Sequence, residues 1–173
     1  YNLSTGEEQG ICTEGGSQRL PTIFNYRIAW MDDRWGNWDI YLYIIPWELE
    51  WALTREEIDQ FILPPADQCY PQLQGDQLVF DDERSGYLLE DIYLFEITYG
   101  FSGNLMPICT DNSRQTFPTV FDDAVSWVDN RNGNNDIYIW QRPAGTDLSV
   151  TVSDDPDPVE VDDYLTYHLH ITN

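Results

Sequence analysis

One motif, a polar turn followed by an apolar strand, occurs three times in the chain and constrains its fold more than any other feature. Each copy joins an acidic turn that contains an arginine to the sequence Asp-Ile-Tyr, and the copies span residues 32–43, 82–95 and 129–140. A proline precedes each copy, and these prolines are 50 and 47 residues apart, at Pro21, Pro71 and Pro118. A period near this length that carries several strands and no helix is typical of β-propeller blades.

The strand that follows each turn is apolar on both of its faces. In the first copy residues 40–43 are Ile-Tyr-Leu-Tyr, so each side of the strand carries large apolar side chains. A sheet that faced water on one side would alternate apolar with polar residues. We therefore expect each sheet to be covered on both faces, as stacked propeller blades are.

The repeat also predicts the organisation of the chain. We expect an isolated outer strand within residues 1–13, four-stranded blades over about residues 18–63 and 68–110, and a blade that lacks its fourth strand over residues 115–141. In the first blade we place the fourth strand at residues 58–63. The preceding segment, 44–57, is then a loop or an extended hairpin, with a short helix at 46–48 as an alternative.

The composition changes after residue 141. Residues 142–146 are predicted to be a linker, and residues 147–173 contain two or three alternating strands of a sandwich domain. An Ig-like sandwich needs about 100 residues and some seven strands, so this segment would be incomplete. The predicted fold class is all-β: about three four-stranded β-propeller blades followed by a partial Ig-like β-sandwich.

The motif Asp-x-Arg-x-Gly-Asn-x-Asp-Ile-Tyr, with its upstream proline, resembles the repeats of TolB-like β-propellers. It looks most like the versions found in archaeal and bacterial cell-surface proteins, and the resemblance covers about residues 1–141. Residues 147–173 are similar to the opening of the Ig-like repeats of large surface proteins, except that Asp162 occupies the place of a usual glycine. These resemblances imply modules that are adhesive, structural or scaffolding.

The charge balance excludes several classes of partner. The chain has 31 acidic residues against 8 basic ones and a net charge of −23. Such a surface repels the phosphates of nucleic acids and anionic membrane faces, and no apolar run approaches the length of a membrane span. We expect an extracellular or cell-surface protein without nucleic-acid partners or membrane insertion. The sequon at Asn2 is a candidate glycosylation site that fits this location.

The arginine in each acidic turn is expected to pair with aspartates and so to pin the hairpin. The residues concerned are Asp32, Arg34 and Asp39 in the first copy, Asp82, Arg84 and Asp91 in the second, and Asp129, Arg131 and Asp136 in the third. The alternative is a calcium site, because calcium takes six to eight oxygen ligands. A guanidinium beside the ion would repel it, so the ion pair is the preferred interpretation.

A second candidate calcium site lies in the tail, and no other cofactor is expected. Its ligands would be the carboxylates of Asp154, Asp155, Asp157 and Glu160. The two histidines, His168 and His170, share one face of a predicted strand and are interpreted as surface residues, with metal binding as the alternative.

Two cysteines and two tryptophans also stand out. Cys12 and Cys109 occupy equivalent positions, each nine residues before a repeated proline. Since equivalent positions of different blades lie far apart, we expect small buried side chains and no bond between the two, with an intermolecular disulfide as the alternative. If exposed, Trp47 and Trp51 would mark a contact surface.

The two incomplete modules suggest a function. We expect a non-enzymatic extracellular structural protein, a surface-layer or filament subunit that self-associates by strand complementation between copies. The alternative is a cell-surface adhesion or binding module that recognises a glycan or protein through the propeller face or the two tryptophans. No Ser/His/Asp set, phosphate loop or paired-cysteine motif is present, so a hydrolase or lyase is only the third hypothesis.

Overall fold

The computed structural model describes residues 4–54, 66–86, 88–143, 149–155 and 166–172. The chain divides into two compact units, Tyr1–Gln141 and Arg142–Asn173. Within the described ranges the regular structure is β-strand, apart from one short 3-10 helix, η1 (Ile45–Trp47). The prediction of an all-β protein is therefore confirmed. None of the described residues belongs to a helix long and apolar enough to cross a bilayer.

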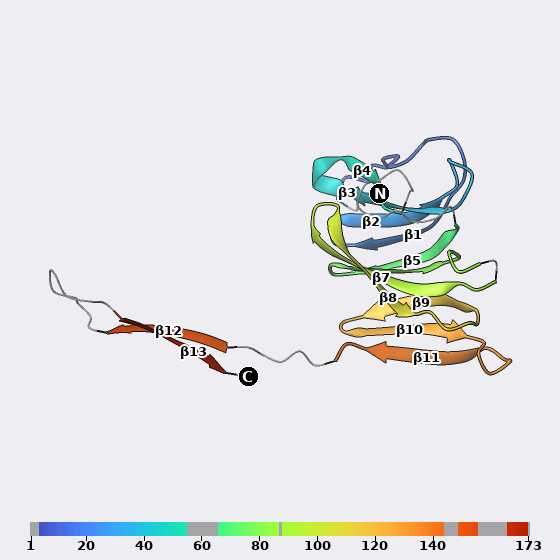
Figure 1. Ribbon diagram of the computed structural model, residues 1–173. Helices are drawn as coiled ribbons and strands as arrows, with labels where there is room; N and C mark the ends of the chain where they lie inside the picture. The colour runs from blue at the N-terminus through green and yellow to red at the C-terminus, as the bar shows by residue number, and fades with distance from the viewer. Residues whose placement is uncertain (1–3, 55–65, 87, 144–148, 156–165, 173) are drawn as a thin grey trace. The chain divides into compact units, whose positions relative to one another are not determined.

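The first unit contains three antiparallel sheets, which we call blades 1, 2 and 3 (Figure 1). Blade 1 consists of β1 (Gln18–Phe24), β2 (Arg27–Asp32), β3 (Asp39–Ile44) and β4 (Leu49–Ala52). Blade 2 consists of β5 (Gln68–Gln74), β6 (Gln77–Asp82), β7 (Asp91–Tyr99) and β8 (Ser102–Cys109). Blade 3 consists of β9 (Gln115–Phe121), β10 (Ala124–Asp129) and β11 (Asp136–Gln141). Consecutive strands pair in each blade, and the described blades do not close into a ring.

The first strand of every blade has the same irregularity at its repeated proline. The residue before the proline has a positive φ in all three blades: 51° at Leu20, 54° at Tyr70 and 55° at Phe117. In each case this residue and the proline together face one residue of the next strand, which is the geometry of a β-bulge. A bulge leaves a residue out of the ladder, so it accepts a proline that has no N–H to donate.

The blades pack face to face, which explains why the third strands are apolar on both sides. The side chains of Ile40 and Leu42 on β3 are fully buried against blade 2, where Phe80 and Phe95 belong to the same cluster. On β7 the side chains of Ile92 and Leu94 are buried in the same way against blade 3, in a cluster with Val125 and Trp127. Each Å² of apolar surface that this stacking removes from water stabilises the fold by about 25 cal/mol.

The fourth strand of blade 1 differs from the prediction. It is β4 (Leu49–Ala52), which follows η1 after one residue and pairs with β3. It therefore lies within the segment that the sequence assigns to a connection, whereas the strand predicted at 58–63 falls outside the described residues. The helix alternative at 46–48 is close to the observed η1, where Pro46 occupies the first turn.

The expected outer strand near the N-terminus is not formed in residues 4–13, which the structure describes as turn and irregular chain. A strand needs a neighbouring strand to bond with, and these residues have none in the described part of the chain. Ile11 and Cys12 instead pack against Trp30, Tyr41 and Tyr43 of blade 1.

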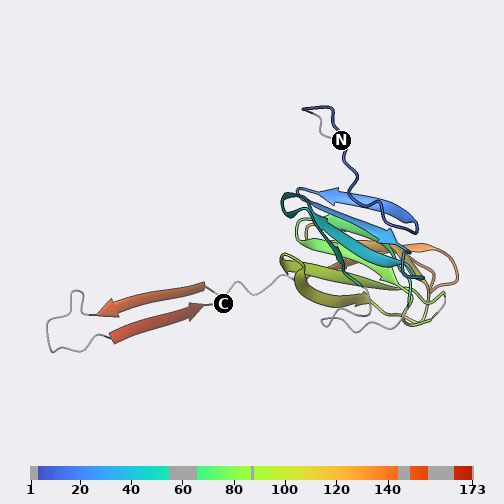
Figure 2. The same cartoon turned by 90° about the horizontal axis from the view of Figure 1, so that it is seen from above.

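The second unit contains an antiparallel hairpin of β12 (Ser149–Asp155) and β13 (Thr166–Thr172) (Figures 1 and 2). The register is regular from the Ser149–Thr172 pair to the Asp155–Thr166 pair. These strands overlap two of the segments predicted from alternation. An Ig-like sandwich has several more strands, so that part of the expectation stays a prediction.

Candidate functional site

The arginine of each acidic turn pairs with the aspartate two residues before it. Arg34 pairs with Asp32, Arg84 with Asp82 and Arg131 with Asp129, and all three aspartates are fully buried. Each aspartate also accepts a hydrogen bond from the backbone N–H of its arginine. A buried carboxylate held in this way resembles a side-chain cap on the turn, and its charge is compensated where water cannot reach it.

The same arginine lies over an aromatic ring in every blade. The guanidinium carbon is 4.3 Å from the ring centre of Tyr41 in blade 1, 4.0 Å from that of Tyr93 in blade 2 and 4.2 Å from that of Tyr138 in blade 3. Each of these tyrosines stacks in turn on an aromatic side chain of the preceding strand: Trp30, Phe80 or Trp127. The repeated turn is therefore a layered structural element of aspartate, arginine and two rings.

The second aspartate of each copy is held by its own turn. Asp39 accepts a hydrogen bond from Asn37 Nδ2 at 3.3 Å, Asp91 accepts one from the Ser85 hydroxyl, and Asp136 accepts from Asn132 and Asn134. The predicted pairing thus involves the first aspartate of each turn, and these Asn and Ser side chains bond the second one.

Hydrogen bonding controls the titration of Asp32 and Asp129. Burial alone would raise the pKa of Asp129, but hydrogen bonds from Arg131 and from Trp127 outweigh it and lower that pKa to about 2. The pKa of Asp32 is lowered by the same balance of forces. Both groups are therefore ionised at any ordinary pH, which suits a structural pin and not a proton-transfer group.

The arginines of blades 1 and 3 also reach a cysteine, a contact that the sequence interpretation missed. Arg34 Nη2 lies 2.8 Å from Cys12 Sγ, and Arg131 Nη2 lies 3.0 Å from Cys109 Sγ. The signal was a spacing of 22 residues between cysteine and arginine in both copies. Cys12, Cys69 and Cys109 are all free thiols, and Cys12 and Cys109 are only half-buried.

The two tryptophans singled out from the sequence have different surroundings. Trp51 on β4 stacks on Phe101, with ring centres 5.1 Å apart and planes 15° apart, and so links the outer parts of blades 1 and 2. Trp47 on η1 is half-exposed and lines a pocket together with Tyr99, whose ring centre is 6.2 Å away. Of these two tryptophans, Trp47 therefore lines this pocket.

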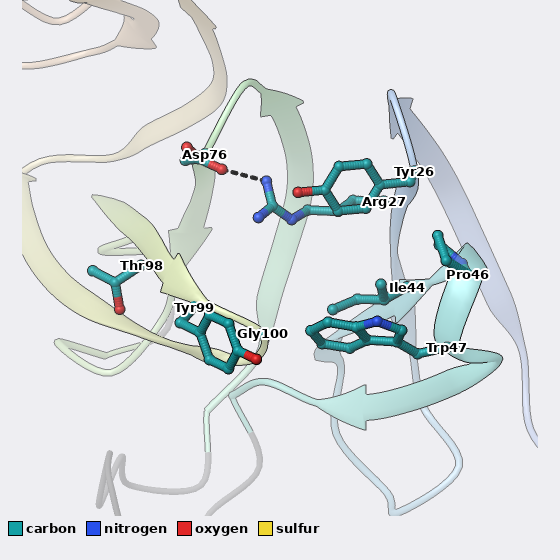
Figure 3. A pocket seen from close by; sticks show the side chains of 9 residues that line it. All are labelled: Tyr26, Arg27, Ile44, Pro46, Trp47, Asp76, Thr98, Tyr99 and Gly100. Atoms are coloured by element: carbon teal, nitrogen blue, oxygen red, sulfur yellow. Dashed lines mark hydrogen bonds and ion pairs between the residues drawn. The ribbon is translucent and has the colours of Figure 1, made fainter.

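This pocket, of about 360 Å³, lies between blades 1 and 2 (Figure 3). Its residues come from the β1–β2 turn and the start of β2, the end of β3 and the η1 helix, the β5–β6 turn, and the end of β7 with the turn that follows it. They are Tyr26, Arg27, Ile44, Pro46, Trp47, Asp76, Thr98, Tyr99 and Gly100. Backbone hydrogen bonds fix two of these turns, from Ile45 N to Tyr26 O and from Ile97 N to Asp76 O.

One ion pair crosses the pocket between the blades. The buried guanidinium of Arg27 pairs with Asp76, whose carboxylate is largely exposed, and also donates to the Gly75 carbonyl oxygen at 3.2 Å (Figure 3). The guanidinium lies over the ring of Tyr26, 4.9 Å from its centre. The sequence did not point to Arg27, Asp76, Tyr26 or Tyr99, because Tyr26 lies 50 residues before Asp76 and 73 residues before Tyr99 and only folding brings these side chains together.

The remaining sequence candidates lie outside the described side chains. Asp154 and Asp155 belong to β12, and His168 and His170 to β13, but only the backbone of these strands is described. Asn2, Asp157 and Glu160 fall outside the described residues. Within the described ranges no three His, Cys, Asp or Glu side chains gather as a metal site would require.

Comparison with known proteins identifies a solved structure with a similar fold. No protein-family model and no curated protein sequence matches the chain. The solved structure of TolB from Acinetobacter baumannii is similar, with a TM-score of 0.61 and 15% sequence identity over 83% of this chain. The match covers 34% of the TolB chain, so this chain spans about a third of its length. At such an identity the likeness concerns the fold alone: the chain has a TolB-like, β-rich fold.

Proposed function

We propose that this protein is a non-enzymatic, extracellular or cell-surface structural subunit that joins other copies of itself through blades 1 and 3. The observation that carries the proposal is the exposure of two isoleucines on β11. Ile137 and Ile139 are 77% and 62% exposed, whereas Ile40, Leu42, Ile92 and Leu94, at the equivalent positions of blades 1 and 2, are 0% exposed. In those blades the next blade covers these positions.

Blade 1 lies at the other end of the stack (Figure 1), and its outward face is open at β1 although Ile11 and Cys12 pack against its Trp30, Tyr41 and Tyr43. Ile23 on β1 is 63% exposed, whereas Leu73 and Val120 at the equivalent positions of blades 2 and 3 are 8% exposed because the preceding blade covers them. Close to it, a hollow of about 340 Å³ is lined by side chains that include Ile28 and Trp30. Blade 3 of one copy placed against blade 1 of another would repeat the packing already present twice within the chain.

Strand β11 supports the same contact. Among the described strands it is hydrogen-bonded to β10 alone, whereas β3 and β7 at the equivalent positions each pair with a fourth strand, β4 or β8. In the described part of the chain β11 is thus an edge strand, and a strand from another copy would complete the ladder. A head-to-tail contact either closes into a ring or continues as a fibre. Two sets of the three described blades would make six, within the roughly four to eight of closed propellers.

Sedimentation analysis of the full chain tests the proposal. The unmodified protein should form dimers or larger species, and a variant with both Ile137→Asp and Ile139→Asp should be monomeric at the same concentration. Leu88→Asp changes an exposed leucine on a turn of blade 2 and serves as the matched control, which should leave the association intact. A stable monomer of the unmodified chain at every concentration would overturn the proposal.

A second candidate function, recognition of a glycan or protein, is favoured by a different observation. Trp47 belongs to a formed pocket with two further aromatic side chains, Tyr26 and Tyr99. Enrichment of exposed aromatic rings around a concave site is characteristic of ligand-binding surfaces. A panel of oligosaccharides and peptides none of which binds would exclude this candidate without affecting the assembly proposal.

A further inference from the structure

The pocket between blades 1 and 2 has two kinds of wall. Trp47 and Tyr99 present ring surfaces on one side, and the pair of Arg27 and Asp76 lies on another (Figure 3). Its volume, about 360 Å³, is within the range of small-ligand sites, which extends from about 300 to 1,000 Å³. The pocket is therefore of a size to take one or two rings of a small molecule.

The aromatic wall is held in place. The indole of Trp47 lies against Gly100, where an added Cβ would come within 3.3 Å of the ring. Gly100 also has a φ of +60°, which a glycine adopts without strain. The ring of Tyr99 is tilted by 53° against the indole. The ring of Trp47 is half-exposed and that of Tyr99 is largely exposed. Burial of apolar surface is favourable by about 25 cal/mol of free energy per Å², so a ligand with an apolar face would bind favourably over these rings.

The charges of the pocket select against ionic ligands. Arg27 and Asp76 are the charged lining residues, and they compensate each other as an ion pair. An anion would meet the exposed carboxylate of Asp76 and the field of a chain with a net charge of −23. A cation would be attracted by the same field, but over the rings it would meet the guanidinium of Arg27, which already lies over Tyr26. A neutral ligand meets neither penalty.

Polar atoms at the edge of the pocket can bond hydroxyl groups. The exposed carboxylate of Asp76 accepts hydrogen bonds, and Thr98 Oγ1, which donates to the Ser102 carbonyl oxygen at 3.2 Å, keeps its lone pairs for a further donor. The phenols of Tyr26 and Tyr99 can both donate and accept. A neutral sugar ring combines an apolar C–H face with hydroxyl groups at its rim. We infer that this pocket binds a neutral saccharide, with the ring face on Trp47 or Tyr99 and its hydroxyls toward Asp76 and Thr98.

The inference rests on the second candidate function and is independent of assembly. It is tested by titrating the full chain, followed by NMR or calorimetry, with neutral cello-, malto-, xylo- and chito-oligosaccharides. Polygalacturonate, a sulfated oligosaccharide and choline represent anionic and cationic ligands. We expect one or more neutral oligosaccharides to bind. Tyr99→Ala and Trp47→Ala should each weaken that binding by roughly tenfold or more, as loss of a central aromatic contact does.

Trp51→Ala is the matched control, because Trp51 is a neighbouring tryptophan that stacks on Phe101 and does not line the pocket. It should leave the affinity within about twofold, which is well below the roughly tenfold loss expected for the two pocket variants. Tyr99 is largely exposed, so Tyr99→Ala should fold normally and keeps the test decisive. Binding of the charged probes alone would overturn the neutral saccharide but keep a binding module. Binding of no probe, or neutral binding that neither Tyr99→Ala nor Trp47→Ala changes, would overturn the saccharide pocket, and the peptide arm of the panel then decides the candidate function.

Discussion

Two buried aspartates in equivalent strands show how the surroundings of a residue decide its charge. Asp129 on β10 has an arginine, an indole N–H and a backbone N–H as partners, and its pKa falls to about 2. Asp81 on β6 is equally buried but receives hydrogen bonds only from Thr116 and the Phe117 backbone N–H among the described residues. Burial dominates there and raises the pKa of Asp81 to about 7.

The raised pKa predicts how stability depends on pH. The folded protein keeps a proton on Asp81 up to about pH 7, whereas the unfolded chain releases it near the usual 3.8. Between these values the folded state binds more protons, so its stability falls as pH rises and levels off above pH 7. Asp81→Asn keeps an oxygen that can accept both hydrogen bonds and removes the charge. Chemical denaturation should therefore show a gain of roughly 1–3 kcal/mol at pH 8.

Asp129→Asn is the matched comparison, because it makes the same change at a carboxylate whose pKa is lowered. It should destabilise the protein at neutral pH by removing half of a buried ion pair, and the loss should shrink as the pH falls toward 2. If Asp81→Asn instead destabilised the protein at pH 8, the ionised carboxylate would be the form that the fold prefers, and the account of Asp81 would be wrong.

At the scale of elements, the sequence predicted the repeated turn and strand well because both depend on local chemistry. The acidic turn and the apolar third strand follow from residues close together in the chain, as residues 32–43 show. The fourth strand of blade 1 was misplaced because residues 49–52 follow a turn of only one residue at Glu48, which adopts a left-handed φ of 51°. Such a turn has no sequence signature when glycine is absent.

The binding pocket could not be predicted for a different reason. Its side chains come from turns of two blades, so they meet only when Tyr26 and Asp76, 50 residues apart, are brought together by stacking. The period of the repeat predicted that the blades stack, but it did not predict which turns would face each other. Of the pocket residues, only Trp47 was singled out from the sequence, together with Trp51, as a tryptophan in the segment that follows the third strand of blade 1.

Strand β8 contains a position where close packing requires glycine. A Cβ added to Gly103 would lie 2.2 Å from the carbonyl oxygen of Glu96 and 2.6 Å from the ring of Phe95, a buried core residue of blade 2. The paired strand cannot move away without disturbing that ring. Gly103→Ala should therefore lower the free energy of unfolding by about 1–3 kcal/mol, as overpacking does, in a thermal or denaturant melt.

Gly15→Ala provides the control for this change, because an added Cβ there meets nothing within 4 Å. Its effect should stay within about 0.5 kcal/mol. An equal loss in both variants would mean that glycine matters at these sites through chain flexibility, and the close contact on β8 would not be the cause.

At the scale of the whole molecule, charge opposes the contact that the open faces favour. Each copy carries a net charge of −23, so two copies repel each other over the distance that salt leaves unscreened. That distance is about 10 Å at 0.1 M ionic strength and about 3 Å at 1 M. The surfaces proposed to meet are apolar, at Ile137 and Ile139 on one copy and Ile23 on the other, so screening removes the repulsion and leaves the attraction.

Self-association should therefore strengthen as sodium chloride is raised from 0.1 to 1 M, in sedimentation runs at one protein concentration, because salt of this strength leaves only about 3 Å of unscreened distance. The variant with Ile137→Asp and Ile139→Asp should stay monomeric at both ends of the series, since it lacks the apolar surface itself. Association that weakens with salt would point to ion pairs across the contact. In that case blades 1 and 3 would not be the surfaces through which copies join.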